Sequence, residues 1–366
     1  MKTICYLADA SNSHTIKWAK YFKNKGYNVH VISLNEGKIE GINVHNFNFN
    51  VKELKNENVF KKVKYITSIK EIKKLIKEIK PDILHAHYAS SYGLIGSLLN
   101  YRPYVLSVWG TDIYDFPKSG IIQKSIIKYN LHKADYIFST SKDMARETKL
   151  YTNKKIYITP FGVDMDVFKK IEEVRINKDK NSITIGTIKT LEKKYGIEYL
   201  IRAFKLILDK YEGSLDINLK VGGSGSQLDT LKELVEELKI QDKVEFLGRV
   251  REQDVPYIFN KFDIAVFPSL RESFGVAAVE AQACEIPVIV TNVGGHKEAI
   301  APSKTGIVIE SQDSNCLYEE LVKLIDNENI RKEMSSKCRD FIKDNYELNS
   351  NFEYINSIYL DILDDK

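Results

Sequence analysis

Short runs of β-branched and aromatic residues alternate with amphipathic, charged segments along most of this chain, and this alternation limits its possible folds more than any other feature. The expected strands of the first half are Thr3–Leu7, Asn28–Leu34, Ile42–Phe47, Ile83–His87, Tyr104–Trp109, Tyr136–Thr140 and Ile156–Thr159. Those of the second half are Ile183–Ile188, Ile217–Val221, Val244–Leu247, Ile264–Pro268, Val288–Thr291 and Gly306–Ile309. Helical patterns separate many of them, as at His14–Lys25, Thr67–Lys80, Ile121–His132, Ile197–Tyr211, Gln227–Lys239 and Val276–Ala283. Such alternation predicts parallel sheets that are covered by helices on both faces.

The alternation stops once, at a charged stretch, and then restarts. Residues Lys169–Asn181 are rich in charge and poor in apolar side chains, which favours a linker. A chain of 366 residues also exceeds one ordinary core. We therefore predict an α/β protein of the GT-B type, with two Rossmann-like doubly wound domains, 1–168 and 169–347, facing across a cleft. Ligands of such sheets bind beyond the carboxyl ends of the strands. The apolar spacing of residues 348–366 predicts a last helix, which we expect to pack back on the first domain.

The composition is that of an ordinary globular protein, with 43% hydrophobic and 28% charged residues. The formal net charge is only +4, which does not favour nucleic acid as a partner. The chain opens on a strand-like segment without a signal sequence, and no apolar stretch approaches the ~20 residues of a membrane helix. The four cysteines, Cys5, Cys284, Cys316 and Cys338, are widely spaced, as suits a reducing compartment. We expect a cytoplasmic protein, soluble or peripheral on the inner membrane face.

Positive charge is concentrated in residues 51–81, where ten lysines stand against four glutamates. Two interpretations stay open. In one, the lysines form a solvated helix face. In the other, they form a patch that attracts an anionic membrane surface, and each nearby lysine contributes about 1 kcal/mol to the binding free energy.

The most specific stretch is PSLRESFGVAAVEAQACEIPVIVTNVGG, residues 268–295, which combines a strand end, a turn, a helix and a second strand. The turn contains Glu272 and the helix contains Glu280, with seven residues between them. The backbone N–H groups of residues 274–276 begin the helix and predict an anion site, where Gly275 lets a ligand approach closely. The carboxylate of Glu280 lies among apolar neighbours in the sequence and therefore needs a partner.

This segment resembles the signature of the large retaining glycosyltransferase family four, whose members have the GT-B fold. The resemblance implies that Glu272 contacts the hydroxyls of the donor sugar and that Glu280 binds the ribose diol. It also implies that the backbone amides of Phe274, Gly275 and Val276 hold the diphosphate.

Shorter matches extend the resemblance over nearly the whole chain. Residues 160–164 (PFGVD) resemble the end of the family's first domain, and the turn at Gly223 resembles its glycine turn after the second strand. Residues 246–250 (FLGRV) resemble its base-binding turn. There the backbone near Arg249 and Val250 is implied to read the nucleobase.

The loop after Gly186 resembles the family's Gly-Arg…Lys-Gly loop, whose two cations bind the diphosphate. This sequence departs from the pattern, because Thr187 stands where arginine is usual and the loop is longer. We assign the two cations to Lys189 and Lys194, with Lys193 as the alternative to Lys194 and a solvated lysine run as the other interpretation. Fixed cations stabilise the negative charge that a breaking sugar–phosphate bond leaves on the diphosphate.

The first domain is expected to supply the acceptor side of the site. His14 follows the first strand and lies at the start of a helix that Ser11 or Ser13 is expected to cap. His85 and His87 lie two apart on one strand and point to the same side. We assign His87 to the cleft and expect one of the two to be a buried, hydrogen-bonded histidine. A metal site at the pair is a less favoured alternative.

The strand end Trp109–Asp112 (WGTD) resembles the family's His-Gly-x-Asp sequence, whose histidine lies beside the donor sugar. Trp109 replaces that histidine, so we do not transfer its role. Asp112 matches the pattern and is assigned to an acceptor or sugar hydroxyl, with helix capping as the alternative.

The resemblance implies a retaining transfer on one face of the sugar, in which the donor phosphate takes the acceptor's proton. We expect a UDP- or GDP-linked sugar as donor and a glycan or lipid-linked acceptor, in cell-surface polysaccharide or glycolipid assembly. No Asp-x-Asp motif lies at a suitable strand end, so we expect neither a cofactor nor a required divalent metal.

Two other functions stay open: a nucleotide-sugar epimerase on the same scaffold, or an inactive nucleotide-sugar-binding partner protein, motivated by Thr187 and Trp109. A dehydrogenase is not favoured. In residues 223–228 (GSGSQL) a leucine replaces the third glycine of the dinucleotide fingerprint, and no acidic strand end follows at the right distance.

Overall fold

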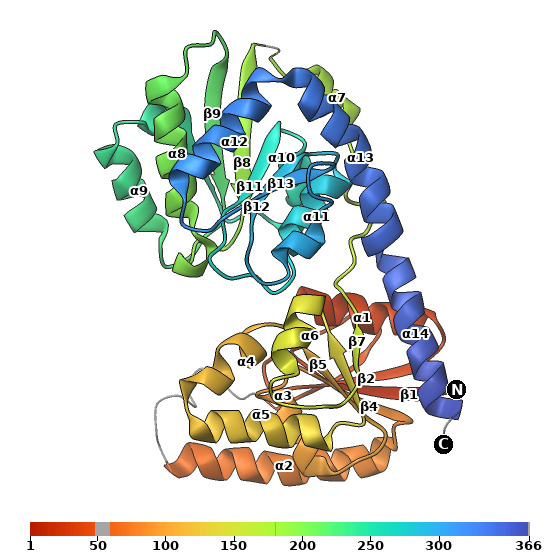
Figure 1. Cartoon of the computed structure of the whole chain (residues 1–366). Helices are drawn as coiled ribbons and strands as arrows, with labels where there is room; N and C mark the ends of the chain where they lie inside the picture. The colour runs from red at the N-terminus through yellow and green to blue at the C-terminus, as the bar shows by residue number, and fades with distance from the viewer. Residues whose placement is uncertain (48–58, 180, 365–366) are drawn as a thin grey trace. The chain divides into compact units, whose positions relative to one another are not determined.

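The structure is a computed structural model of the whole chain, which describes residues 1–47, 59–179 and 181–364. The chain forms two compact units (Figure 1). The first comprises Met1–Pro160 and Asn351–Lys366, and the second comprises Phe161–Ser350. The predicted division after residue 168 therefore falls inside the second unit. The reason is packing of the segment from Phe161 onward: the Arg339 guanidinium donates to the carbonyls of Met165 and Phe168, at 2.7 and 2.9 Å.

The first unit is built on a parallel sheet of seven strands. Their order across the sheet is β3 (Asn43–Asn46), β2 (Asn28–Ser33), β1 (Thr3–Leu7), β4 (Ile83–His87), β5 (Tyr104–Val108), β6 (Tyr136–Ser139) and β7 (Ile156–Ile158). Its helices are α1 (Ser13–Asn24), α2 (Val59–Ile79), α3 (Tyr92–Leu99), α4 (Thr111–Tyr114), α5 (Ile121–Lys133) and α6 (Lys142–Thr148). Every residue of β4 and β5 is buried, because helices cover both faces of the sheet, as expected for parallel strands.

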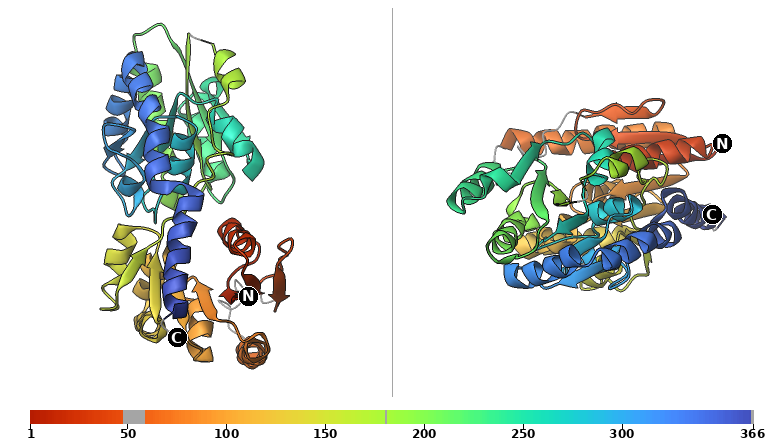
Figure 2. Two further views of the ribbon diagram at one scale, coloured as in Figure 1. Left: turned by 90° about the vertical axis from the view of Figure 1, so that its right-hand side faces the viewer. Right: turned by 90° about the horizontal axis from the view of Figure 1, so that it is seen from above.

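The last helix, α14 (Leu348–Asp364), returns the chain to the first unit (Figure 2). Its Phe352 ring stacks on Tyr21, with ring centroids 4.6 Å apart. Further along the helix, the Tyr359 hydroxyl lies 2.5 Å from Nδ1 of His85 in β4. A ring contact with α1 and a hydrogen bond to β4 thus attach this helix to the first unit.

The second unit contains a parallel sheet of six strands. Their order is β10 (Val244–Gly248), β9 (Asp216–Gly222), β8 (Ser182–Ile188), β11 (Ile264–Phe267), β12 (Val288–Thr291) and β13 (Gly306–Ile309). Its helices are α7 (Glu172–Ile176), α8 (Ile197–Lys210), α9 (Leu228–Glu237), α10 (Val255–Phe259), α11 (Val276–Ala283), α12 (Ser314–Asp326) and α13 (Glu328–Tyr346). The predicted α/β class with two doubly wound, Rossmann-like units is confirmed, whereas the charged stretch predicted as a linker contains α7.

Both sheets reverse their strand order at one strand. In the first unit β1 lies between β2 and β4, and in the second β8 lies between β9 and β11. At such a switch point the connections leave in opposite directions, which opens a crevice at the carboxyl ends of the central strands. The topology therefore indicates one ligand site per unit, after β1 and β4 in the first and after β8 and β11 in the second.

Candidate functional site

Glu272 lies in the loop after β11, at the switch point of the second sheet, and its side chain is buried. Its Oε2 atom lies 2.6 Å from Nζ of Lys189, and its Oε1 accepts a hydrogen bond from the backbone N–H of Ser273 at 3.2 Å. Burial alone would raise the pKa of Glu272, but the charge of Lys189 and the hydrogen bonds from Lys189 and Ser273 outweigh burial and lower it. The carboxylate is therefore ionised in the folded protein at neutral pH.

Lys189, directly after β8, is the partner of Glu272. Burial would lower the pKa of this ammonium, but the charge and hydrogen bond of Glu272 and the charge of Glu280 raise it instead. Its Nζ also lies 4.6 Å from the centre of the Tyr195 ring, within cation–π distance. The second predicted cation, Lys194, is exposed, with its Nζ 5.0 Å from the same ring. Both predicted lysines therefore contact the Tyr195 ring at the carboxyl end of β8. The sequence did not indicate this role for Tyr195.

The glycine turn after β9 packs directly on the lysine loop. Gly223 has φ +140°, and a Cβ atom there would lie 1.8 Å from the carbonyl oxygen of Lys189. Its N–H donates to the carbonyl of Gly248 at 2.8 Å. The turn at Gly248 leads into Arg249, which is exposed, and Val250, which lies against Gly222. Three turns after neighbouring strands therefore meet at one edge, as the predicted phosphate and base assignments require.

The helix α11 begins at the same edge, and its N-cap residue is a glycine, which has no side chain to cap it. Its N-cap residue Gly275 has φ +103°, and a Cβ there would lie 2.6 Å from Cδ2 of His296. The helix start therefore presents the amides of Phe274, Gly275 and Val276, whose partial positive charge favours an anion. Phe274 contributes only its backbone, because its ring is buried.

Glu280 lies on the second turn of α11 and is half-buried. The charge of Glu280 contributes to raising the pKa of Lys189, so the two side chains interact electrostatically. Thr187, which replaces the family's arginine, lies inside β8 and is fully buried. Its side chain cannot take the arginine's place in contacting a ligand at the surface.

His296 was missed as a site residue by sequence reasoning. It is fully buried, its Nδ1 lies 3.4 Å from the Thr291 hydroxyl, and its Nε2 has no hydrogen-bond partner among the described residues. Burial lowers the pKa of His296 to about 4, so the imidazole is neutral at pH 7. The buried imidazole packs directly against the backbone of Gly275.

The first unit contains a pocket of about 250 Å³ at the carboxyl ends of β1, β2, β4 and β5. We call this the first-sheet pocket. It is lined by Asp9, Asn12, Thr15, Asn35, His87, Tyr88, Ser91, Tyr92 and Trp109. The pocket therefore lies at the switch point between β1 and β4, the position the topology indicates for a ligand.

His87 is the member of the histidine pair that reaches this pocket, whereas His85 is a core residue. Both ring nitrogens of His85 are occupied, Nδ1 by Tyr359 and Nε2 by the Ser107 hydroxyl at 2.7 Å. Both ring nitrogens of His87 are buried without a hydrogen-bond partner among the described residues. His14 is half-buried and packs edge-on against Trp109, with ring centroids 6.1 Å apart. One buried, hydrogen-bonded histidine was predicted, and His85 is that residue.

Asp112 is fully buried and binds backbone groups. Its carboxylate accepts hydrogen bonds from the N–H groups of Ala89 and Gly110 at 2.7 Å each and from that of Trp109 at 3.2 Å. These N–H groups precede the first turn of α4 (Thr111–Tyr114), whose N-cap residue Gly110 has no side chain to cap it, so the carboxylate binds loop backbone rather than capping the helix. Asp112 also does not line the first-sheet pocket.

The predicted cap of the first helix is wrong. Asn12, not Ser11 or Ser13, is the N-cap, because its Oδ1 accepts hydrogen bonds from the N–H groups of His14 and Thr15 at 2.9 and 3.3 Å. Ser11 instead donates its hydroxyl to Asp9 at 2.7 Å.

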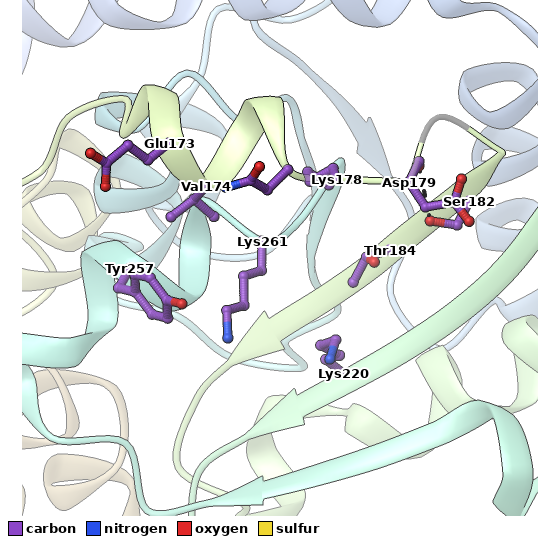
Figure 3. Close-up of a pocket in the computed structure, with 10 residues that line it drawn as sticks. Glu173, Val174, Lys178, Asp179, Ser182, Thr184, Lys220, Tyr257 and Lys261 are labelled. Atoms are coloured by element: carbon purple, nitrogen blue, oxygen red, sulfur yellow. Dashed lines mark hydrogen bonds between the residues drawn. The ribbon is translucent and has the colours of Figure 1, made fainter.

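A second cavity, of about 440 Å³, lies elsewhere in the second unit (Figure 3). It is lined by residues around α7, by Tyr257 of α10 and by Ser182 and Thr184, which belong to the beginning of β8. Two of its three lysines form ion pairs, Lys178 with Asp263 at 2.6 Å and Lys220 with Glu245 at 2.5 Å, and Nζ of Lys261 lies 4.5 Å from the centre of the Tyr257 ring. The amino end of a parallel strand is not where such sheets bind ligands, so we do not assign this cavity to the reaction.

Three further predictions concern a metal site, a membrane span and the lysine-rich segment. Within the described part of the chain, no three His, Cys, Asp or Glu side chains come together as a metal site. No described helix combines the length and apolarity that crossing a bilayer requires. Of the lysine-rich segment 51–81, residues 51–58 lie outside the described residues, as do the side chains of residues 59–67.

Comparison with known proteins agrees with this geometry. Residues 3–141 match the family model "Glycosyl transferase 4-like", and residues 168–341 match "Glycosyl transferases group 1". The chain is 28% identical over 315 residues to an uncharacterized glycosyltransferase of Methanocaldococcus jannaschii, covering 85% of this chain and 83% of the relative. It is 26% identical to an N-acetyl-alpha-D-glucosaminyl L-malate synthase of Bacillus anthracis, covering 78% and 76%.

A solved structure of the Anabaena protein HepE in complex with UDP shares the fold, with a TM-score of 0.81 and 16% identity over 99% of this chain and 100% of that one. Two family models that together span both units, relatives named as glycosyltransferases, and a shared two-unit architecture agree with one another. The chain therefore belongs to the group 1 (family-four type) glycosyltransferases of the GT-B fold.

Proposed function

We propose that this glycosyltransferase takes its sugar from a nucleoside diphosphate sugar, bound by the second unit at the carboxyl edge of its sheet. The observation that carries the proposal is the buried Lys189–Glu272 pair beside the start of α11, whose N-cap residue is Gly275. Helix-start amides and an ammonium favour phosphate oxygens, and an ionised carboxylate accepts hydrogen bonds from sugar hydroxyls. The UDP complex of the Anabaena structural neighbour supports the same class of ligand.

Each residue predicted for the donor side has a role in this proposal. Lys189 and Lys194 neutralise the diphosphate, to which the amides of residues 274–276 donate hydrogen bonds. Glu272 orients the donor sugar and Glu280 binds the ribose. The backbone of Arg249 and Val250 reads a uracil or guanine base next to the turn at Gly223.

The transfer proceeds with retention in this proposal. The bond from the anomeric carbon to the phosphate oxygen breaks, and the acceptor oxygen bonds to that carbon on the same face. The acceptor's proton passes to the departing phosphate oxygen. Lysines and helix-start amides that are already in place stabilise the leaving diphosphate without reorganisation of solvent. NMR of the product tests this step: retention gives the donor's anomeric configuration, and the opposite configuration contradicts it.

Titration calorimetry and turnover assays with UDP, GDP and their sugar conjugates test the assignment. We expect one nucleotide family to bind and its sugar to be transferred. Glu272→Ala should abolish transfer, whereas Glu237→Ala, an exposed carboxylate on α9, should leave it unchanged. A donor that is isomerised without transfer would indicate an epimerase instead, and binding without turnover of any donor would indicate an inactive partner protein.

The proposal includes no cofactor and no required divalent metal, because the lysines supply the positive charge at the diphosphate. Turnover that survives EDTA supports this point. Loss of turnover in EDTA that returns with added Mg²⁺ or Mn²⁺ contradicts it.

We also propose that the acceptor is a glycan or a lipid-linked glycan and that the first unit associates with the anionic inner membrane face. The described end of α2 supports this, because Lys70, Lys73, Lys74 and Lys77 are exposed. At the start of α5, Ile121 and Ile122 are 86% and 73% exposed. Sedimentation with phosphatidylserine vesicles should fall as salt screens the lysines, and binding that salt leaves unchanged contradicts an electrostatic contact.

A further inference from the structure

We propose that the first-sheet pocket selects an uncharged, hydroxyl-rich ring, such as a pyranose, as the acceptor and discriminates against anionic acceptors. The inference rests on the proposed transferase function and names the chemical class of its second substrate. It is carried by three features of the pocket: buried polar groups without partners among the described residues, a lining whose charge is negative, and amides at the start of α1 that are already occupied.

Two polar side chains in the pocket lining are buried without hydrogen-bond partners among the described residues. They are His87, through both ring nitrogens, and Thr15, through its hydroxyl, and each side chain belongs to a residue only 1% exposed. Buried polar groups normally have partners, so an unsatisfied pair beside a pocket indicates a ligand that supplies them. Burial and the charge of His14 lower the pKa of His87 to about 3, so the imidazole is neutral. It therefore offers one donor and one acceptor, which suits a hydroxyl group.

The charge of the pocket lining is negative. Asp9 is the one acidic residue among the lining residues, and the lining contains no lysine or arginine. The Asp9 carboxylate accepts hydrogen bonds from Ser11 at 2.7 Å and from the Asn35 amide at 2.6 Å, so it is held in place beside the pocket. A carboxylate accepts hydrogen bonds only, so it attracts hydroxyl donors and repels a phosphate or carboxylate.

Several backbone amides around the pocket are occupied by the protein's own acceptors. Asn12 takes the N–H groups of the first turn of α1, and Asp112 takes those at Ala89 and Gly110. At the start of α3, the N–H of Gly93 donates to the Tyr88 carbonyl at 3.0 Å. Helix starts bind anions through such amides, and at the start of α1 the Asn12 side chain already accepts from them.

The remaining surface of the pocket is aromatic. The Trp109 ring packs against His87 with centroids 4.5 Å apart, and Tyr88 and Tyr92 complete the aromatic lining. At about 250 Å³, the pocket lies below the ~300–1,000 Å³ of sites for drug-sized ligands, so it suits one ring rather than a chain. Aromatic faces with a few fixed polar groups suit the mixed apolar and hydroxyl surface of a sugar ring.

A matched acceptor series tests the inference on the full-length protein with its active donor. Methyl pyranosides are compared with the same pyranosides carrying a 6-phosphate, and with malate as a small dicarboxylate. We expect kcat/KM for the neutral pyranoside to exceed that for its phosphate by at least tenfold. Asp9→Asn removes the negative charge that repels the phosphate. It should lower the ratio of the two kcat/KM values by roughly tenfold.

Thr15→Val removes one unpartnered hydroxyl at nearly constant volume. It should raise the KM for the pyranoside by roughly two- to tenfold and leave the KM for the donor unchanged. Thr148→Val is the matched control, because Thr148 is a buried threonine of the same unit whose hydroxyl bonds within α6. Its acceptor KM should equal that of the wild type.

The outcomes separate the two claims. Preferred turnover of malate or the sugar 6-phosphate overturns the acceptor inference and leaves the transferase function standing. Failure of every nucleotide sugar to bind or turn over refutes the proposed function itself.

Discussion

Nζ of Lys189 lies 2.6 Å from Oε2 of Glu272, and the two side chains are only 14% and 10% exposed. Lys189 follows β8 and Glu272 follows β11, so the pair joins the two strands at the switch point of the second sheet. Each charge is buried beside the other, and each therefore depends on its partner for its ionised form. The same two groups lie where the proposed donor sugar and diphosphate meet.

Breaking this pair should destabilise the second unit more than removing it entirely. Lys189→Met or Glu272→Gln leaves one buried group without its partner, at a cost of about 3–5 kcal/mol for a remaining charge. The double variant should lose less stability than the sum of the two single variants. Urea unfolding of the four proteins measures the coupling, and additive losses would show that the two side chains act independently. All three variants should lack transferase activity.

Gly223→Ala should disturb the lysine loop directly. The added Cβ would lie 1.8 Å from the Lys189 carbonyl, at a φ of +140° that favours glycine. The turn must move, so we expect a loss of roughly 1–3 kcal/mol in stability and weaker nucleotide binding. Gly26→Ala is the control, since Gly26 also has a positive φ but nothing within 4 Å of an added Cβ. It should lose about 1 kcal/mol and bind nucleotide as the wild type does. Equal effects of the two variants on nucleotide affinity would contradict the packing argument.

Asp112 should prove to be a structural residue of the first unit. Asp112→Ala leaves the backbone N–H groups of Ala89, Trp109 and Gly110 without their acceptor, at a cost of about 1–3 kcal/mol. Thermal unfolding of Asp112→Ala and Asp112→Asn measures this loss, which should be smaller for asparagine because its amide oxygen still accepts hydrogen bonds. If stability is unchanged and only the acceptor KM rises, Asp112 binds a substrate hydroxyl instead.

Acid should destabilise the protein below the pH at which free histidine titrates. Burial lowers the pKa of His14 and His296 to about 4 and that of His87 to about 3. In the unfolded chain these groups bind protons below about pH 6.5, whereas in the folded protein they stay neutral. Stability is therefore complete above about pH 6.5 and falls as the pH drops towards 4.

His87→Asn tests this pH dependence, because it removes one buried imidazole. At pH 4.5 its loss of stability relative to pH 7 should be smaller than that of the wild type by on the order of 2 kcal/mol. The control His132→Asn replaces an exposed histidine of α5 and should follow the wild type. Melting curves between pH 7 and pH 4 give the comparison, and parallel curves for all three proteins would contradict it.

The sequence predicted the sheets well because parallel strands that are buried on both faces have nearly continuous apolar sequences. The runs at Ile264, Val288 and Gly306 became β11, β12 and β13 nearly as expected, and α11 was predicted with its true bounds. Boundaries were less certain. Helix α2 begins at Val59 rather than Thr67, because the sequence specifies the existence of a helix better than its ends.

Local polar contacts were harder to predict, because several candidates stand next to one another. Asn12 caps α1 although two serines flank it, and the choice depends on the direction of one side chain. Sequence reasoning assigned both Lys189 and Glu272 to the site without pairing them, since 83 positions separate them along the chain. The unpartnered groups of Thr15 and His296 are visible only once the fold buries them, and no local pattern reports that.

The central claim is that the carboxyl edge of the second sheet holds a nucleoside diphosphate. A crystal structure of the protein with bound UDP or GDP tests it most directly. We predict the diphosphate at the amides of Phe274, Gly275 and Val276 with Lys189 in contact, and the base beside Arg249. A nucleotide bound at any other place, such as the cavity around Lys178, with that edge empty, would contradict the account.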